Sequence, residues 1–170
     1  MRWVRFDWPL TEREFLSPDV AGYRLRAAVP DDLDAMLGVV RAAYASDPAW
    51  RGLVADIERR VGARIRDSLR DPSAHFVVAD HGSHLVGLNG VAVRLSTGQN
   101  FITGICVAPE HQGRGLGGAL LAASLAWLRD QGLAVATVTT DARSVAARVY
   151  QRFGATRIEG VEYPDAPRGT

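Results

Sequence analysis

The chain has 170 residues, of which 47% are hydrophobic and 23% are charged, and these values are typical of one globular domain large enough for a proper core. Its formal net charge is +1 and no predicted face gathers basic residues, so nucleic acids and anionic membranes are not favoured as partners. No segment approaches the roughly 20 uninterrupted apolar residues that a membrane-spanning helix requires.

The first part of the chain predicts an arm, a strand and two helices. Residues 1–21 show no clear hydrophobic period, so we expect an N-terminal arm that packs on a domain at residues 22–163. The alternating segment 22–29 predicts a strand. Apolar residues at helical spacing predict one helix after Pro30 and a second helix over about 49–70.

The remainder of the chain predicts an α/β domain. Three β-like runs separated by turn residues predict an antiparallel meander over 74–80, 85–95 and 101–107. A helix, a strand, a helix and a strand are predicted next, over about 117–130, 133–140, 142–153 and 156–163. The β–α–β unit that starts at the third run predicts two parallel strands with a right-handed crossover. Residues 164–170 predict a frayed tail.

Amino-acid usage indicates a source and a compartment. All 20 basic residues are arginine, whose codons are rich in GC, so we expect a bacterium with a GC-rich genome. The single cysteine, Cys106, excludes an internal disulfide and fits a reducing compartment. The N-terminal segment contains Asp7 and lacks a long apolar core, so no signal peptide is expected. These features predict a cytoplasmic protein.

The stretch from Val107 to Leu121 is the most informative part of the sequence. It ends a β-like run, breaks at Pro109, places four glycines within six residues and then begins an apolar helix. This order leaves unpaired backbone N–H groups at a helix N-terminus, which suits a phosphate or pyrophosphate. The sequence therefore predicts a ligand that carries phosphate.

One interpretation of this loop is a dinucleotide-binding fingerprint. Gly113-x-Gly115-x-x-Gly118 formally matches that pattern, and Asp141 ends the next predicted strand about 20 residues later. The loop does not open directly off its strand, because residues 108–112 intervene, and an antiparallel meander precedes it. An NAD-binding Rossmann protein is therefore less favoured, and a Walker P-loop is excluded because no lysine follows the glycines.

The other interpretation rests on two motifs. Gln112-x-x-Gly115-x-Gly117 resembles the acyl-CoA binding signature of the GNAT acetyltransferase superfamily. Further along, segment 143–154 resembles the part of that family in which Ala, Tyr and Gly occur at this spacing, with Tyr150 as the tyrosine. Both motifs occur in the expected order, so the sequence is similar to that family.

The resemblance covers about residues 22–163 and the whole order of predicted elements. It implies a mixed, mostly antiparallel sheet flanked by helices, in which strands 101–107 and 133–140 splay apart. Two departures stand out: Arg143 replaces an asparagine of many members, and Phe153-Gly154 reverses the usual order. The chain also ends after its sixth main strand. The seventh strand of many members is missing, or the N-terminal arm or a partner subunit of a homodimer supplies it.

The resemblance implies a role for each part of the loop. Backbone N–H groups would wrap the pyrophosphate of CoA, and the preceding strand would pair with the pantetheine arm. Arg114 could add direct charge pairing and Arg143 could hold a phosphate. The implied CoA-binding residues are Ile105, Cys106, Val107, Gln112, Gly113, Arg114, Gly115, Leu116, Gly117, Gly118 and Arg143.

Tyr150 is the candidate catalytic residue. An amine that attacks a thioester expels a thiolate, which a phenol with a pKa of about 10 can protonate; the alternative is an aromatic residue on the core face of the last helix. Cys106 lies beside the implied thioester, but a lone cysteine in an apolar strand is usually a small core residue. His81-x-x-His84 reads as a hairpin turn with two solvated imidazoles, so no metal is expected.

A general base is not evident in the sequence. Many relatives place a carboxylate on the fourth strand, whereas residues 101–106 contain none, and Thr103 could at most orient a water. This absence favours an α-amine, with a pKa near about 8, over a lysine amine near about 10.4. The resemblance thus predicts an N-acetyltransferase that moves an acetyl group from acetyl-CoA to a primary amine of a small molecule or peptide by direct transfer. The alternative is an acyl-CoA binding or sensor module without turnover.

Overall fold

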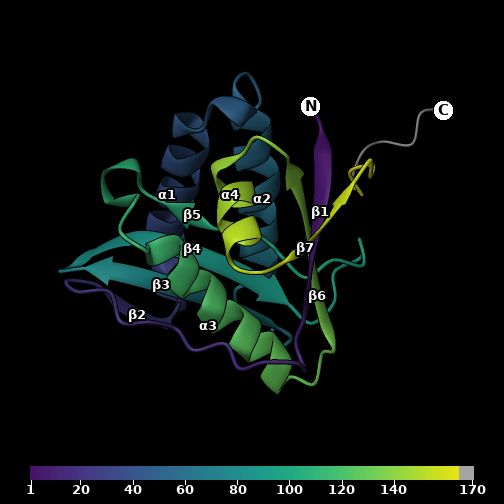
Figure 1. Ribbon diagram of the computed structural model, residues 1–170. Helices are drawn as coiled ribbons and strands as arrows, with labels where there is room; N and C mark the ends of the chain where they lie inside the picture. The colour runs from purple at the N-terminus through teal and green to yellow at the C-terminus, as the bar shows by residue number, and fades with distance from the viewer. Residues whose placement is uncertain (165–170) are drawn as a thin grey trace.

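Two β-sheets form the centre of the structure, a computed structural model that describes residues 1–164 (Figure 1). One sheet has the strand order β2-β3-β4-β5 and the other has the order β6-β1-β7. The strands are β1 (Trp3–Pro9), β2 (Arg24–Ala27), β3 (Ala74–His81), β4 (His84–Ala92), β5 (Cys106–Val107), β6 (Val135–Asp141) and β7 (Thr156–Glu159). The α-helices are α1 (Leu33–Ser46), α2 (Val54–Ser68), α3 (Leu116–Asp130) and α4 (Val145–Arg152).

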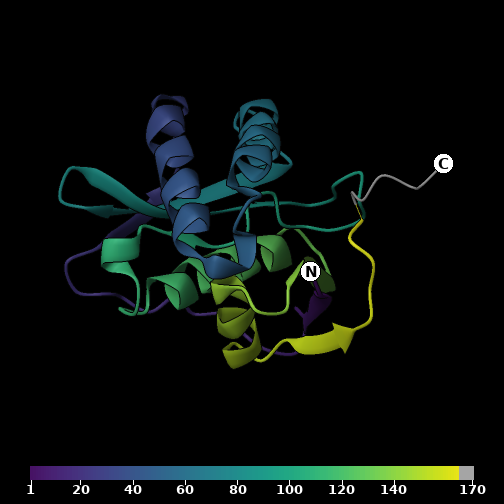
Figure 2. The same cartoon turned by 90° about the horizontal axis from the view of Figure 1, so that it is seen from above.

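Helices cover both faces of the four-stranded sheet. Helices α1 and α2 lie on one face and α3 lies on the other (Figure 2). Successive residues of β3 alternate between these layers: Phe76 and Val78 pack with α1 and α2, whereas Val77 and Ala79 pack with α3. A strand buried on both faces reads as a continuous apolar run, which is why 74–80 is recognisable in the sequence. The predicted antiparallel meander is confirmed.

The N-terminal segment is a central strand, so the expectation that residues 1–21 lack a period was wrong. Strand β1 lies between β6 and β7 and is antiparallel to both. Val4, Phe6 and Trp8 are fully buried, whereas the residues between them are partly exposed. The period of two is hidden in the sequence because Trp3 occupies an outward position. The arm therefore supplies the seventh strand, one of the three alternatives that the sequence left open.

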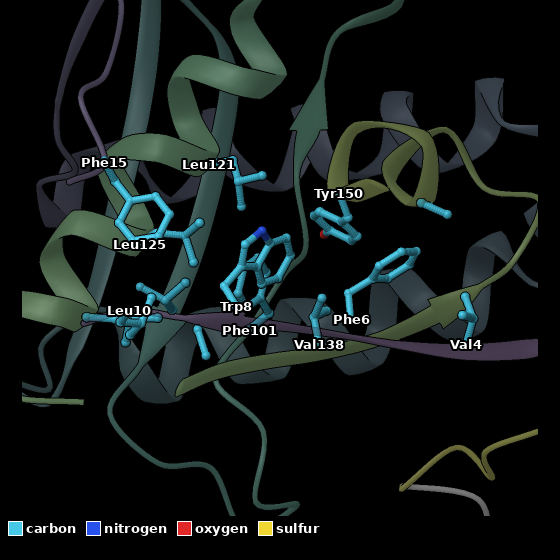
Figure 3. Packing of buried hydrophobic residues seen from close by; sticks show 14 residues of the cluster. Val4, Phe6, Trp8, Leu10, Phe15, Phe101, Leu121, Leu125, Val138 and Tyr150 are labelled. Atoms are coloured by element: carbon cyan, nitrogen blue, oxygen red, sulfur yellow. The ribbon is translucent and has the colours of Figure 1, made fainter. Parts of the chain in front are cut away.

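The buried side chains of β1 form the core of the smaller sheet. Phe6 and Trp8 pack edge-on against Tyr150 of α4, with ring centroids 5.5 and 5.4 Å apart, and Trp8 also stacks on Phe101. Leu121 and other apolar residues of α3 close this cluster from the side (Figure 3). The N-terminal strand thus holds the helix that carries the candidate catalytic tyrosine.

The predicted strand at 101–107 is shorter than expected. Only Cys106 and Val107 form a regular ladder with β4, and Phe101 makes an isolated bridge to Val91. Gly104 has a φ of +68°, which breaks the extended conformation, and the Thr103 hydroxyl instead accepts a hydrogen bond from the Gly90 N–H at 2.9 Å. The strand is interrupted because of Gly104. The residues around it form a mostly apolar run, and for that reason the whole segment 101–107 was predicted as one strand.

The predicted splay between residues 101–107 and 133–140 is confirmed, because β5 and β6 belong to different sheets. At one end the gap is closed by two side chains before β5. The Gln99 side-chain oxygen accepts from the Thr139 N–H and the Asn100 oxygen accepts from the Thr137 N–H, both at 3.0 Å. The two sheets are therefore joined at one end and open towards the glycine loop.

Other boundaries differ from the prediction by a few residues. The second helix begins at Val54, because Pro48–Trp50 form a short 3-10 turn instead. The last strand ends at Glu159, before Gly160 with a φ of +70°. The predicted tail lies outside the described residues except for Pro164. Among the described helices, none is long and apolar enough to cross a membrane.

Candidate functional site

A pocket lies in the gap between the two sheets. Its floor and sides come from β5, β6, α1, α2 and α4, and the glycine loop forms one end. The pocket brings the candidate catalytic residue Tyr150 together with six of the implied CoA-binding residues, which are Ile105, Cys106, Val107, Gln112, Gly113 and Gly117. Residues separated by more than 40 positions in the chain thus face one space.

The glycine loop has the geometry of an open helix N-terminus. Helix α3 begins after Gly115, whose φ is +86°, and Gly113 has a φ of +74°. A Cβ atom added at Gly113, Gly115 or Gly118 would meet no other atom within 4 Å, so these backbone groups face open space. The Gln112 amide donates to the Val107 carbonyl at 3.0 Å and ties the loop to β5. Unpaired N–H groups and the helix dipole favour an anion here.

Strand β5 is the open edge of its sheet. It pairs with β4 on one side only, while Ile105, Cys106 and Val107 line the pocket. An open strand edge offers backbone N–H and C=O groups to an extended ligand. Together with the loop, it forms one continuous polar track from the helix N-terminus into the pocket.

Five other predicted residues do not line the pocket. Gly115 and Gly118 belong to the loop described above, and the three remaining side chains are placed differently. The Arg114 guanidinium donates to the Tyr23 hydroxyl at 2.9 Å and does not line the pocket. Arg143 pairs with the buried Asp141 carboxylate at 3.1 Å, its side chain is 67% exposed, and it does not line the pocket either. The Leu116 side chain is buried under the four-stranded sheet, so only its backbone belongs to the loop.

Tyr150 is both a core residue and a pocket residue. Its ring is 1% exposed and packs against Phe6 and Trp8, while the Ile105 N–H donates to its hydroxyl oxygen at 3.3 Å. A Cβ atom at position 104 would lie 3.3 Å from the Tyr150 hydroxyl oxygen, closer than an ordinary van der Waals contact, so glycine is the residue that fits there without crowding the hydroxyl. Burial raises the pKa of Tyr150, which keeps the phenol protonated at neutral pH. The ring of Tyr150 is therefore a core residue, while its hydroxyl group lies at the pocket, so the two interpretations made from the sequence are compatible.

A second, partly buried phenol was missed in the sequence. The Tyr44 hydroxyl, on α1, donates to the Thr103 carbonyl at 2.8 Å. It also approaches Gly104, at 3.7 Å from the position that a Cβ atom would take there. The Thr103 hydroxyl is used as well, since it donates to the Gly104 carbonyl at 2.6 Å. Thr103 therefore stabilises the interrupted strand. Tyr44 was missed because it lies at the helical spacing of ordinary core residues, which gives it no distinguishing signal in the sequence.

Asp47 is the other residue that sequence reasoning missed. It is 6% exposed and is the one carboxylate among the described residues that line the pocket. Its Oδ1 accepts from the Ala49 N–H at 3.0 Å and its Oδ2 accepts from the Val145 N–H at 2.8 Å. The sequence shows only an Asp-Pro helix stop, because its contact with α4 spans 98 positions.

Aromatic side chains form the wall next to Asp47. The Trp50 ring lies 5.4 Å from the ring of Tyr44 and 6.1 Å from that of Trp3, and Trp3 stacks on Tyr163 at 4.4 Å. Trp50, Tyr44 and Tyr163 line the pocket. Arg64 of α2 also lines it. This end of the pocket therefore combines aromatic faces with one carboxylate and one guanidinium.

Cys106 is a buried thiol. Its side chain is 1% exposed and packs with apolar residues of α1 and α2, and burial raises its pKa to about 12. Because the thiolate is the nucleophile, the thiol is inert at neutral pH.

We expect Cys106 to resist a disulfide reagent at pH 7.5 in the native protein and to react in 8 M urea or a similar denaturant, as followed by released chromophore. Cys106→Ala should unfold about 1 kcal/mol more easily. Fast reaction of Cys106 in the native protein would contradict its burial.

Comparisons with known proteins agree with this geometry. The model of the acetyltransferase (GNAT) family matches residues 40–155, and the chain belongs to that family. Mycothiol acetyltransferase of Pseudarthrobacter chlorophenolicus is 36% identical over 166 residues, covering 91% of this chain and 50% of that protein. The chain thus spans about half the length of the curated relatives it matches.

Solved structures share the fold. A GCN5-related N-acetyltransferase from Ralstonia eutropha JMP134 superposes with a TM-score of 0.67 at 22% identity, covering 85% of this chain and 99% of that one. AAC(6')-Iy, in complex with a CoA-containing bisubstrate analogue, superposes with a TM-score of 0.58 at 20% identity, covering 83% and 95% of the two chains. The predicted class of fold is confirmed.

Proposed function

We propose that the protein transfers an acetyl group from acetyl-CoA to a primary amine of a small molecule by direct transfer. The observation that carries this proposal is the pocket itself, which runs from an open helix N-terminus along an unpaired strand edge to the hydroxyl of Tyr150. Family membership supports the same reaction class. The names of the matched relatives support an acetyl transfer without deciding the acceptor.

The glycine loop and β5 would hold the donor. N–H groups at the start of α3 would bind the pyrophosphate, and the dipole of that helix adds about 0.3–1 kcal/mol per favourable charge contact. The backbone of Ile105, Cys106 and Val107 would pair with the pantetheine arm. When bound, acetyl-CoA supplies an acyl group on a thioester, whose departing sulfur requires a proton. The Tyr150 hydroxyl would donate it, because the phenol is protonated at neutral pH and lines the pocket beside the Ile105 N–H.

The proposal is tested by measuring binding and turnover separately. Calorimetry should detect acetyl-CoA binding, and a thiol reagent should detect free CoA when a panel of primary amines is added. The panel should include mycothiol without its acetyl group, since relatives carry that name. Binding without thiol release for every amine would instead favour an acyl-CoA sensor of the same fold.

Gly115→Ala tests the loop. Alanine at a φ of +86° costs about 1–2 kcal/mol, and relief of that strain would move the N–H groups that face the anion. We expect the Kd for acetyl-CoA to rise about tenfold, which corresponds to about 1.4 kcal/mol. Gly132→Ala is the matched control, because it has a φ of +89° at the other end of α3 and open space around it. An equal change of Kd in both variants would contradict the loop assignment.

A further inference from the structure

We propose that Asp47 receives the acceptor amine, binding it as an ammonium ion and taking the proton that must leave before attack. The inference rests on the proposed acetyltransferase function and adds to it the missing base and the charge of the acceptor. No side chain of β5 supplies a carboxylate, whereas Asp47 reaches the same pocket from the turn after α1.

The surroundings of Asp47 leave it free to bind a cation. A carboxylate has about four lone-pair positions, and the Ala49 and Val145 N–H groups occupy two of them. The second of these bonds fixes the carboxylate beside the N-terminus of α4, the helix that carries Tyr150. Asp47 thus reaches the pocket from a position tied to the helix that bears the proton donor.

Among the residues that the structure describes, five other ionisable side chains line the pocket. They are Tyr44 from α1, Arg64 from α2, Cys106 from β5, Tyr150 from α4 and Tyr163 from the C-terminal segment. Burial raises the pKa values of Tyr44, Cys106 and Tyr150, so these groups hold their protons at neutral pH. Arg64 is a cation. Asp47 is therefore the carboxylate that the described lining of the pocket offers to a cation.

The aromatic wall fits the same ligand. Trp50 and Tyr44 line the same pocket as Asp47, and the faces of aromatic rings attract an ammonium group. Arg64 lines the same pocket, and its positive charge disfavours a second ammonium group on the acceptor. The chemical class that this end of the pocket recognises is therefore a small monoammonium compound.

The transfer step balances with these two residues. One N–H proton of the ammonium passes to Asp47, and the freed nitrogen pair forms the N–C bond to the acetyl carbon. The C–S bond breaks, and the sulfur keeps its electron pair and takes the Tyr150 proton. A second N–H proton restores the phenol, and Asp47 releases its proton to water. The products are the acetamide and free CoA thiol.

The test compares Asp47→Asn with the wild-type protein over amines of graded pKa at one assay pH. An amine that is protonated at that pH should lose at least about 100-fold in kcat/KM, because asparagine can neither pair with it nor take its proton. An amine that is already neutral should lose much less. Raising the pH towards the amine pKa should narrow the difference. The Kd for acetyl-CoA should stay the same.

Asp71→Asn is the matched control. Asp71 also precedes a proline and accepts from the N–H two positions on, at 2.8 Å from Ser73, but it does not line the pocket. Equal losses for all amines in Asp47→Asn would overturn the proposal and leave Asp47 as a structural tie to α4, and unchanged rates would overturn it as well. Failure of the proposed function looks different, because the wild-type protein would then release no thiol with any amine.

Discussion

Tyr150→Phe is expected to lower kcat by about 10²–10⁴-fold with little change in the Kd for acetyl-CoA. Phenylalanine keeps the ring contacts with Phe6 and Trp8, so the core around α4 stays filled. The hydroxyl alone is lost, and with it the proposed proton donor for the departing thiolate. The hydroxyl oxygen accepts from the Ile105 N–H, which leaves its own proton for donation.

Thiol release in steady state and calorimetric titration with acetyl-CoA measure this effect. Tyr44→Phe is the matched comparison, because it removes another phenol hydroxyl that lies beside Gly104. That hydroxyl already donates to the Thr103 carbonyl, so its removal should lower kcat much less. If Tyr150→Phe retains wild-type kcat, Tyr150 serves packing alone and another group protonates the sulfur.

Trp8→Ala is expected to destabilise the protein by about 3–5 kcal/mol, as large aromatic truncations in cores do. Trp8 is fully buried at the centre of β1, where it stacks on Phe101 and meets the edge of Tyr150. A cavity there would loosen both sheets at their junction and release α4. Turnover should therefore fall together with stability.

Urea unfolding followed by far-ultraviolet circular dichroism measures the loss without relying on tryptophan emission. Trp3→Ala is the control on the same strand, because Trp3 points outward and is partly exposed. It should cost far less, because the variant loses only the ring contacts of a partly exposed side chain with Tyr163 and Trp50. An equal loss of unfolding free energy in the two variants would mean that the buried side chains of β1 do not contribute more to stability than its exposed ones.

Local signals in the sequence predicted the glycine loop, the helix that follows it and the position of Tyr150. Glycines with positive φ at 113 and 115, an apolar helix after them and a tyrosine at a fixed distance are features of neighbouring residues, and spacing reveals them. The resemblance to the family also predicted that β5 and β6 splay apart. The length of β5 was not predicted correctly, because Gly104 breaks the hydrogen-bond ladder inside an otherwise apolar run.

The sequence by itself determined the class of fold, the glycine loop at a helix N-terminus and the candidate tyrosine, since each depends on residues close together in the chain. Only the tertiary structure decided that β1 occupies the middle of the second sheet, because pairing of Phe6 with Val138 and Arg157 is a contact between distant segments. The same holds for Asp47, whose bond to Val145 spans 98 positions. Burial and long-range pairing, which no local pattern encodes, place that carboxylate in the pocket.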